Sequence, residues 1–152
     1  SRSMVPLGSD SEKLKDYLEI IRLRQDGRFT YTVQVDPAVR DVLIPKLWVQ
    51  PVVENSVKYG SLRKQTLHVD LTARMEDGFL LLTVEDNGTG FEPQRLKEVQ
   101  DSLTDPKKGT RQSGLQSLAR RLVLLYGKES SVTIESEYMV HTRVTLRMRR
   151  GG

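Results

Sequence analysis

An aspartate at the end of an apolar run is the first residue whose setting could support chemistry. Residues 79–84 are typical of a buried strand, and because side chains alternate along a strand, Leu82, Val84 and Asp86 face the same side. An unpaired charge on an apolar face is costly, so the carboxylate needs a donor, such as the amino group of a flat heterocycle. Residues 87–90 then allow a sharp turn and a close approach to a ligand, although an ordinary Asp-Asn-Gly turn is the alternative.

Two further stretches offer polar groups of the kind that a nucleotide uses. Residues 49–60 predict a helix with an apolar stripe, and Asn55 lies at the edge of this stripe, where an amide reaches into a cleft or is simply solvated. Residues 104–113 are a basic loop without periodicity, and Gly114 opens the next helix. The free N–H groups and the dipole of a helix start favour an anion, so this loop is either a phosphate cradle or a solvated surface loop.

Composition limits the other classes of function. The 152 residues suit one domain, and the absence of cysteine excludes disulfides, thiolate metal sites and a cysteine nucleophile. Two histidines leave little for a histidine metal site. The net charge of +4 favours anionic ligands, but basic residues are scattered and aromatics scarce, so a nucleotide is a better hypothesis than nucleic acid. Neither a membrane-spanning run nor a signal-peptide pattern is present, and we expect this fragment to be soluble.

Periodicity predicts the elements that must position these groups. We expect residues 1–9 to be a linker or a remnant of cloning and residues 10–150 to form the domain. His68 and His141 fall on exposed positions of strands. The pattern predicts an α/β (α+β) two-layer sandwich, in which helices cover one face of a mixed, mostly antiparallel sheet. We expect helices over residues 10–26, 51–60, 93–102 and 114–127, with Pro45 in a first helical turn, and strands over residues 28–35, 42–44, 65–75, 79–84, 132–134 and 138–148.

Three segments in a fixed order resemble the nucleotide-binding motifs of the GHKL superfamily, which includes gyrase, histidine kinases and MutL. Residues 54–60 (ENSVKYG) resemble its N box, residues 86–91 (DNGTGF) its G1 box, and residues 113–115 (SGL) its G2 box. The chain is most similar to LytS/YesM-type sensor histidine kinases. That similarity rests on YLEI at 17–20, Arg24, VDP at 35–37, IP at 44–45, QPVVEN at 50–55 and Arg121-Leu122.

The resemblance implies a Bergerat-type ATP fold and a role for each matched position. Asp86 would accept from the adenine amino group, Asn55 would bind the Mg²⁺ that bridges the phosphates, and residues 104–113 would form the ATP lid. The implied catalytic residues are Asn55 and Glu54. The implied nucleotide-binding residues are Asn55, Lys58, Tyr59, Asp86, Gly88, Gly90, Phe91, Gly109, Ser113, Gly114 and Leu115.

Three positions depart from the superfamily pattern. Pro51 stands where ATP-hydrolysing members carry a basic Glu, which argues against a gyrase-like ATPase. Gln112 and Ser117 replace a Gly and an Asn of the phosphate-binding region. These two departures leave open a degenerate nucleotide-binding or interaction module, and a serine kinase related to anti-sigma factors is a further alternative.

The resemblance also implies partners. The phosphoacceptor histidine of such kinases lies on a dimerisation helix, a context that neither His68 nor His141 fits. We therefore expect a catalytic domain that acts on a dimerisation and phosphoacceptor domain of the same kinase and, indirectly, on a response regulator. Nucleic acid is not expected as a partner. The parent would be a homodimeric, membrane-anchored bacterial sensor with this domain in the cytoplasm.

Overall fold

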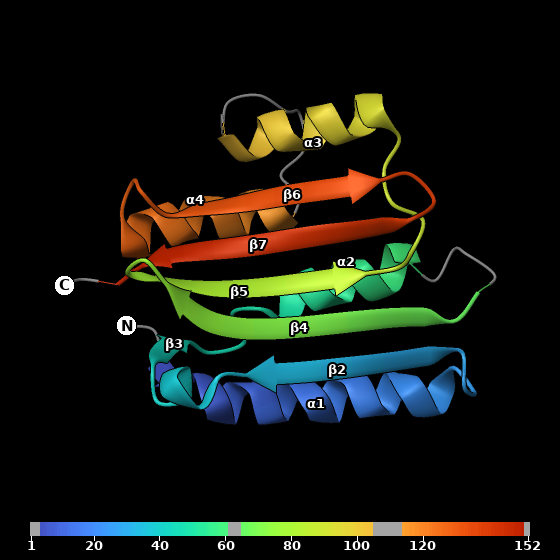
Figure 1. The fold of residues 1–152 in the computed structure, drawn as a ribbon, viewed down its shortest axis with the longest axis horizontal. Helices are drawn as coiled ribbons and strands as arrows, with labels where there is room; N and C mark the ends of the chain where they lie inside the picture. Colours follow the sequence, from blue (N-terminus) through green and yellow to red (C-terminus); the bar gives the residue numbers. More distant parts are fainter. Residues whose placement is uncertain (1–3, 61–64, 105–113, 151–152) are drawn as a thin grey trace.

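A five-stranded sheet forms the centre of the molecule (Figure 1), and the computed structural model describes residues 4–60, 65–104 and 114–150. The strand order is β2-β4-β5-β7-β6, and every neighbouring pair is antiparallel except β2 with β4. The strands of this sheet are β2 (Phe29–Val35), β4 (Leu67–Glu76), β5 (Phe79–Asp86), β6 (Ser131–Glu137) and β7 (His141–Arg149), and a second sheet pairs β1 (Met4–Pro6) with β3 (Leu43–Pro45). The helices are α1 (Leu7–Arg24), the 3-10 helix η1 (Pro37–Val39), α2 (Gln50–Gly60), α3 (Pro93–Thr104) and α4 (Gly114–Tyr126).

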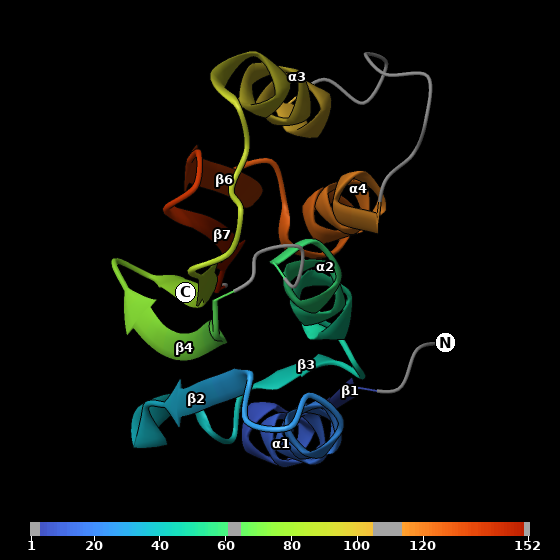
Figure 2. The same ribbon diagram turned by 90° about the vertical axis from the view of Figure 1, so that its right-hand side faces the viewer.

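The two faces of the sheet differ in the way that the alternating pattern predicts. The inward residues of β4 and β5 are apolar and buried, and α2 lies over these two strands, while α4 lies over β6 and β7 (Figure 2). The opposite face carries threonines and charges, with Thr72, Thr83, Thr145 and Thr133 in register across four strands. The two-layer α+β sandwich with a mostly antiparallel sheet is thus confirmed. None of the helices in the described ranges is long and apolar enough to cross a membrane.

Helices also flank both edges of the sheet. Gln100 of α3 donates from its Nε2 atom to the carbonyl of Ile134 in β6, at 2.9 Å. At the other edge, the Tyr31 hydroxyl of β2 donates to Glu19 of α1, at 2.8 Å. Uncovered strand edges invite pairing with other chains, so these contacts protect the sheet.

The N-terminal boundary differs from the one expected from the sequence. The first helix begins at Leu7, not at Asp10 or Ser11, and residues 4–6 pair with β3. The N–H groups of Leu7 and Gly8 donate to the carbonyls of Val42 and Arg40, both at 2.8 Å. These distant carbonyls satisfy the first helical turn, so no side-chain cap is needed. Residues 4–9 therefore belong to the fold.

The segment before α2 also corrects a prediction. Pro45 ends strand β3 and is not helical, whereas Pro51 lies in the first turn of α2, where a missing N–H costs nothing. Trp48 is buried just before this helix and donates from Nε1 to the sulfur of Met148, at 3.2 Å. The Arg121 guanidinium stacks over the indole at 5.0 Å. Trp48 thereby joins the start of α2 to α4 and β7.

Candidate functional site

The acidic residue singled out in the sequence is buried at the end of its strand. Asp86 is the last residue of β5 and is 6% exposed. Its Oδ1 accepts from the Gly88 N–H at 2.8 Å, and the Ser56 hydroxyl of α2 donates to the same carboxyl group. Burial raises the pKa of Asp86, while the bonds from Gly88 and Ser56 and the nearby His141 act in the opposite direction. A carboxylate has about four acceptor positions, so two bonds leave capacity for a ligand amino group.

The turn after Asp86 packs directly on the end of α2. A Cβ atom on Gly88 would lie 2.5 Å from Cα of Gly60 and 2.9 Å from Oδ1 of Asp86. Gly90 has a φ of +69°, and a Cβ there would lie 2.5 Å from the carbonyl oxygen of Glu137. Both glycines are therefore required by close backbone approach, and Gly90 also by its conformation.

The β6–β7 hairpin holds the other side of this turn. Phe91 donates its N–H to the Ser136 hydroxyl at 2.9 Å, and Met139 donates its N–H to the Thr89 carbonyl at 2.5 Å. The Thr89 hydroxyl oxygen is buried and has no hydrogen-bond partner among the described residues. An orphaned hydroxyl in the turn that follows a buried carboxylate is a group that a polar ligand would satisfy.

Helix α2 presents Asn55 next to this site. Asn55 is half-buried and directly precedes Ser56, the residue that contacts Asp86. Glu54 is exposed and accepts from the Gln50 side chain at 3.0 Å. Burial raises the pKa of Tyr17 on α1, and the charge of Glu54 raises it further.

The last turn of α2 carries the other two residues expected from the N box. Lys58 and Tyr59 are both exposed, and the Lys58 ammonium lies 5.3 Å from the centre of the Tyr59 ring. Both lie in the same last turn as Gly60, the residue on which the Asp86 turn packs.

The start of α4 is the third segment that the sequence singled out. Gly114 is exposed as the first residue of this helix, and Leu115 is buried in the core. Gly109 and Ser113 lie outside the described residues, as do Gln112 and all but the first residue of the expected lid. Their roles remain predictions.

Sequence reasoning missed three residues of the site. The bond of Ser136 to Phe91 and the bond of Thr89 to Met139 could not be foreseen without the tertiary structure. Ser56 did leave a signal, because it follows Val53 by three residues and Val52 by four, a spacing that continues the buried stripe of α2 to Gly60. A polar residue on an apolar stripe points to a buried partner, which here is Asp86.

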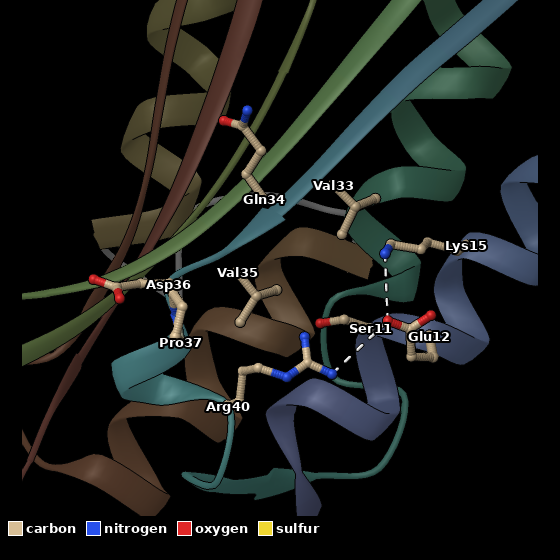
Figure 3. Close-up of a pocket in the computed structure, with 9 residues that line it drawn as sticks. All are labelled: Ser11, Glu12, Lys15, Val33, Gln34, Val35, Asp36, Pro37 and Arg40. Atoms are coloured by element: carbon tan, nitrogen blue, oxygen red, sulfur yellow. Dashed lines mark hydrogen bonds and ion pairs between the residues drawn. The ribbon is translucent and has the colours of Figure 1, made fainter.

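A cavity of about 430 Å³ lies elsewhere, at the far end of β2 (Figure 3). Its size falls in the range of small-ligand sites, about 300–1,000 Å³. However, its two cations, Lys15 and Arg40, are balanced by the two carboxylates Glu12 and Asp36 in the lining, and both cations contact Oε1 of Glu12, at 3.3 and 3.8 Å. Asp86 pairs with Val69, and Val69 pairs with Tyr31, so the cavity beside Val33 and Val35 lies two strands away from Asp86 and about 7–13 Å further along β2. The lining residues are Ser11, Glu12, Lys15, Val33, Gln34, Val35, Asp36, Pro37 and Arg40.

Comparisons with known proteins agree with this geometry. Residues 41–152 match the family described as histidine kinase-, DNA gyrase B- and HSP90-like ATPases. The sensor protein LytS of Staphylococcus haemolyticus is 33% identical over 133 residues, which cover 87% of this chain and 23% of that protein. The sensor histidine kinase YesM of Bacillus subtilis is 29% identical over 146 residues, 95% of this chain and 24% of YesM.

Solved structures share the fold at low sequence identity. The catalytic domain of histidine kinase ThkA superposes with a TM-score of 0.71 at 11% identity, covering 99% of this chain and 96% of that one. The histidine kinase domain of a blue-light activated kinase from Erythrobacter litoralis gives 0.61 at 22% identity, covering 97% and 68%.

The chain spans about a quarter of the length of the curated relatives it matches. The family match covers most of this chain and contains Asp86, Asn55 and the two close-packed glycines. The chain therefore belongs to the family of histidine kinase-, DNA gyrase B- and HSP90-like ATPases.

Proposed function

We propose that this chain is the catalytic and ATP-binding domain of a sensor histidine kinase, and that it presents the γ-phosphate of MgATP to a histidine on another domain. ATP is the ligand that its family implies. The observation that carries the proposal is the close packing of the Asp86 turn on the end of α2, where a Cβ atom on Gly88 would lie 2.5 Å from Cα of Gly60. This packing places the acid that would contact the base beside the helix that carries Asn55.

The residues around Asp86 fit an adenine nucleotide. Asp86 accepts a hydrogen bond from the adenine amino group, and its burial makes the charge-assisted bond stronger than it would be in water. Gly88 and Gly90 let the backbone approach the ring, and the orphaned Thr89 hydroxyl gains a partner. Phe91, half-buried against the core, supplies apolar contact.

The phosphate end is assigned to α2 and to the start of α4. Asn55 would supply an amide oxygen to Mg²⁺, a ligand type that this hard cation prefers. The chemistry that the cation would supply there is neutralisation of phosphate charge. Glu54 lies beside Asn55 as the second catalytic candidate, and we assign Lys58 and Tyr59, in the last turn of the same helix, to nucleotide binding. Gly114 and Leu115 begin α4, whose free N–H groups attract the phosphates. We assign Gly109 and Ser113 to the same phosphate-binding role.

Transfer to another domain suits this arrangement better than hydrolysis. Pro51, one helical turn before Asn55, offers no carboxylate to activate water. His68 and His141 lie on strands of the sheet and not on a dimerisation helix. We assign the acceptor histidine to a dimerisation domain of a homodimeric parent, with a response regulator downstream. We also propose that this domain lies on the cytoplasmic side of a membrane-anchored sensor. This proposal is extended to the chain from its relatives, which are named as sensor proteins.

Calorimetric titration with ATP, in Mg²⁺ and in EDTA, tests the binding step. We expect weak binding that Mg²⁺ strengthens. The transfer step is tested by adding a segment that carries the acceptor histidine and measuring its phosphorylation from labelled ATP. No heat and no thermal shift at millimolar nucleotide would refute the kinase proposal and favour a degenerate interaction module. Binding without transfer would refute only the catalytic part.

A further inference from the structure

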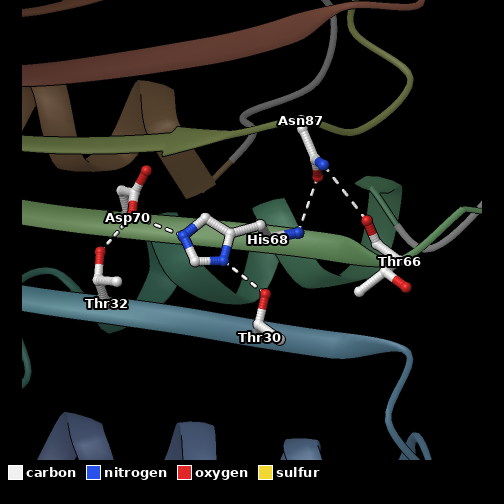
Figure 4. A network of polar contacts seen from close by, with 6 residues as sticks. All are labelled: Thr30, Thr32, Thr66, His68, Asp70 and Asn87. Carbon is white, nitrogen blue, oxygen red and sulfur yellow. Dashed lines mark hydrogen bonds and ion pairs between the residues drawn. The ribbon is translucent and has the colours of Figure 1, made fainter.

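The side chain of Asn87 turns toward the beginning of β4, although the residue stands between Asp86 and Gly88 (Figure 4). Its Oδ1 accepts from the His68 N–H at 2.7 Å, and its Nδ2 donates to the Thr66 carbonyl at 3.3 Å. Its backbone N–H donates to the His68 carbonyl at 3.3 Å. Its own carbonyl accepts from the Gln65 side chain at 2.9 Å. Both the backbone and the side chain of Asn87 therefore bind residues 65–68.

These contacts begin where the strand ladder ends. The last pair of the β4–β5 ladder joins Val69 to Asp86, yet β4 remains paired with β2 as far as Leu67. The Asn87 side chain adds hydrogen bonds beyond the end of the β4–β5 ladder. It thereby connects the turn to the start of β4, which is already paired with β2. A side chain of another shape would leave the His68 N–H without this acceptor.

The neighbouring imidazole fixes the same segment to the edge strand. His68 Nδ1 lies 2.5 Å from the Thr30 hydroxyl, and its Nε2 lies 2.8 Å from Oδ1 of Asp70 (Figure 4). The segment that Asn87 grips is thus held by β2 as well. The turn that follows Asp86 is held at three places. It packs on Gly60 of α2, it bonds to the β6–β7 hairpin, and its Asn87 side chain bonds to the start of β4.

We propose that Asn87 is a positioning residue for the nucleotide, which acts through Asp86 and makes no contact with the ligand itself. This inference rests on the proposed function. Asn87 holds the turn so that the carboxylate and the Gly88 N–H keep their places before the ligand arrives. Such preorganisation lowers the free energy that ordering the turn would otherwise cost on binding.

Ser130 supplies a matched control. Its hydroxyl also bridges two backbone groups, since it donates to the Tyr126 carbonyl at 3.1 Å and accepts from the Arg149 N–H at 2.9 Å. Arg149 pairs with Phe79, at the opposite end of β5 from Asp86. Ser130→Ala should therefore lower stability by a similar mechanism without affecting the nucleotide pocket.

The test compares the wild type with Asn87→Ala, Asn87→Asp and Ser130→Ala, well below each melting temperature. We expect Asn87→Ala to weaken MgATP binding about fivefold to tenfold, because Asp86 is no longer held in position before the ligand binds. The ratio of the affinities for ATP and GTP should decrease as well, because Asp86 is the residue that contacts the base. Asn87→Asp keeps the acceptor for the His68 N–H and should recover part of the affinity. Ser130→Ala should bind as the wild type does.

A second measurement does not need nucleotide. Without Asn87 to anchor the turn, the Gly88 amide proton should exchange with solvent faster in Asn87→Ala than in the wild type. Unchanged MgATP affinity and unchanged Gly88 exchange in this variant would overturn the inference while leaving the proposed function intact. A wild type that binds no ATP would instead refute the proposed function, and with it the nucleotide role of Asn87.

Discussion

Replacing Gly88 by alanine should separate the Asp86 turn from the end of α2. The new Cβ would stand 2.5 Å from Cα of Gly60, about 1 Å closer than ordinary carbon–carbon contact. Gly60 has little room to retreat, because a Cβ at its own position would lie 2.6 Å from Cδ1 of Leu67. Gly88 does not have a positive φ, so the effect comes from steric overlap and not from backbone conformation.

Overpacking of this kind costs about 1–3 kcal/mol. For a chain of this size, each kcal/mol lowers the melting temperature by about 2–4 °C, so we expect a loss of about 2–12 °C. Nucleotide affinity should fall as well, because the same Cβ lies 2.9 Å from the carboxylate of Asp86. Scanning calorimetry and titration with MgATP measure the two effects.

Gly114→Ala is the control for stability. A Cβ at Gly114 meets no described atom within 4 Å and its φ is not positive, so the change should be neutral or should add up to about 1 kcal/mol. If Gly88→Ala melted at the temperature of the wild type and bound MgATP equally well, the close packing of the turn on α2 would be wrong.

Three further changes test other parts of the structure. Asp86→Asn should weaken MgATP binding about tenfold to a hundredfold, because a hydrogen bond to a charged group contributes about 1.5–3 kcal/mol. It should also raise the melting temperature, because a buried charge is removed. Unchanged affinity in a titration would refute the adenine contact. Trp48→Ala should cost about 3–5 kcal/mol in urea unfolding, since it leaves a cavity beside Met148, and a loss below 1 kcal/mol would contradict the packing. The Arg22 guanidinium lowers the pKa of Glu19 from 4.5 to about 2, so this carboxylate contributes stability above pH 4.5 that is lost as the pH falls toward 2. The difference in unfolding free energy between wild type and Glu19→Gln should shrink over that range; a difference independent of pH would refute the assignment.

Local patterns predicted most elements within a few residues of their observed bounds. The clearest case is the β4–β5 hairpin, where Asp77 and Gly78 adopt φ values of +51° and +83°, as the Glu-Asp-Gly turn predicts. The errors occur where a backbone N–H group finds its acceptor far away in the sequence, as at Leu7, or where a proline fits more than one backbone conformation, as at Pro45.

The sequence alone determined the alternation of the strands, the apolar side of the sheet and the position of Asp86 at the end of an inward-facing row. These properties depend on the period of two along a strand and on the cost of exposing apolar surface. Only the tertiary structure decided that Ser56 reaches Asp86, that Gly88 packs on Gly60 and that Asn87 grips β4. The partners in these contacts are 19 to 30 positions apart in the sequence, and no local pattern encodes such pairs, because they follow from how the helices and strands pack together.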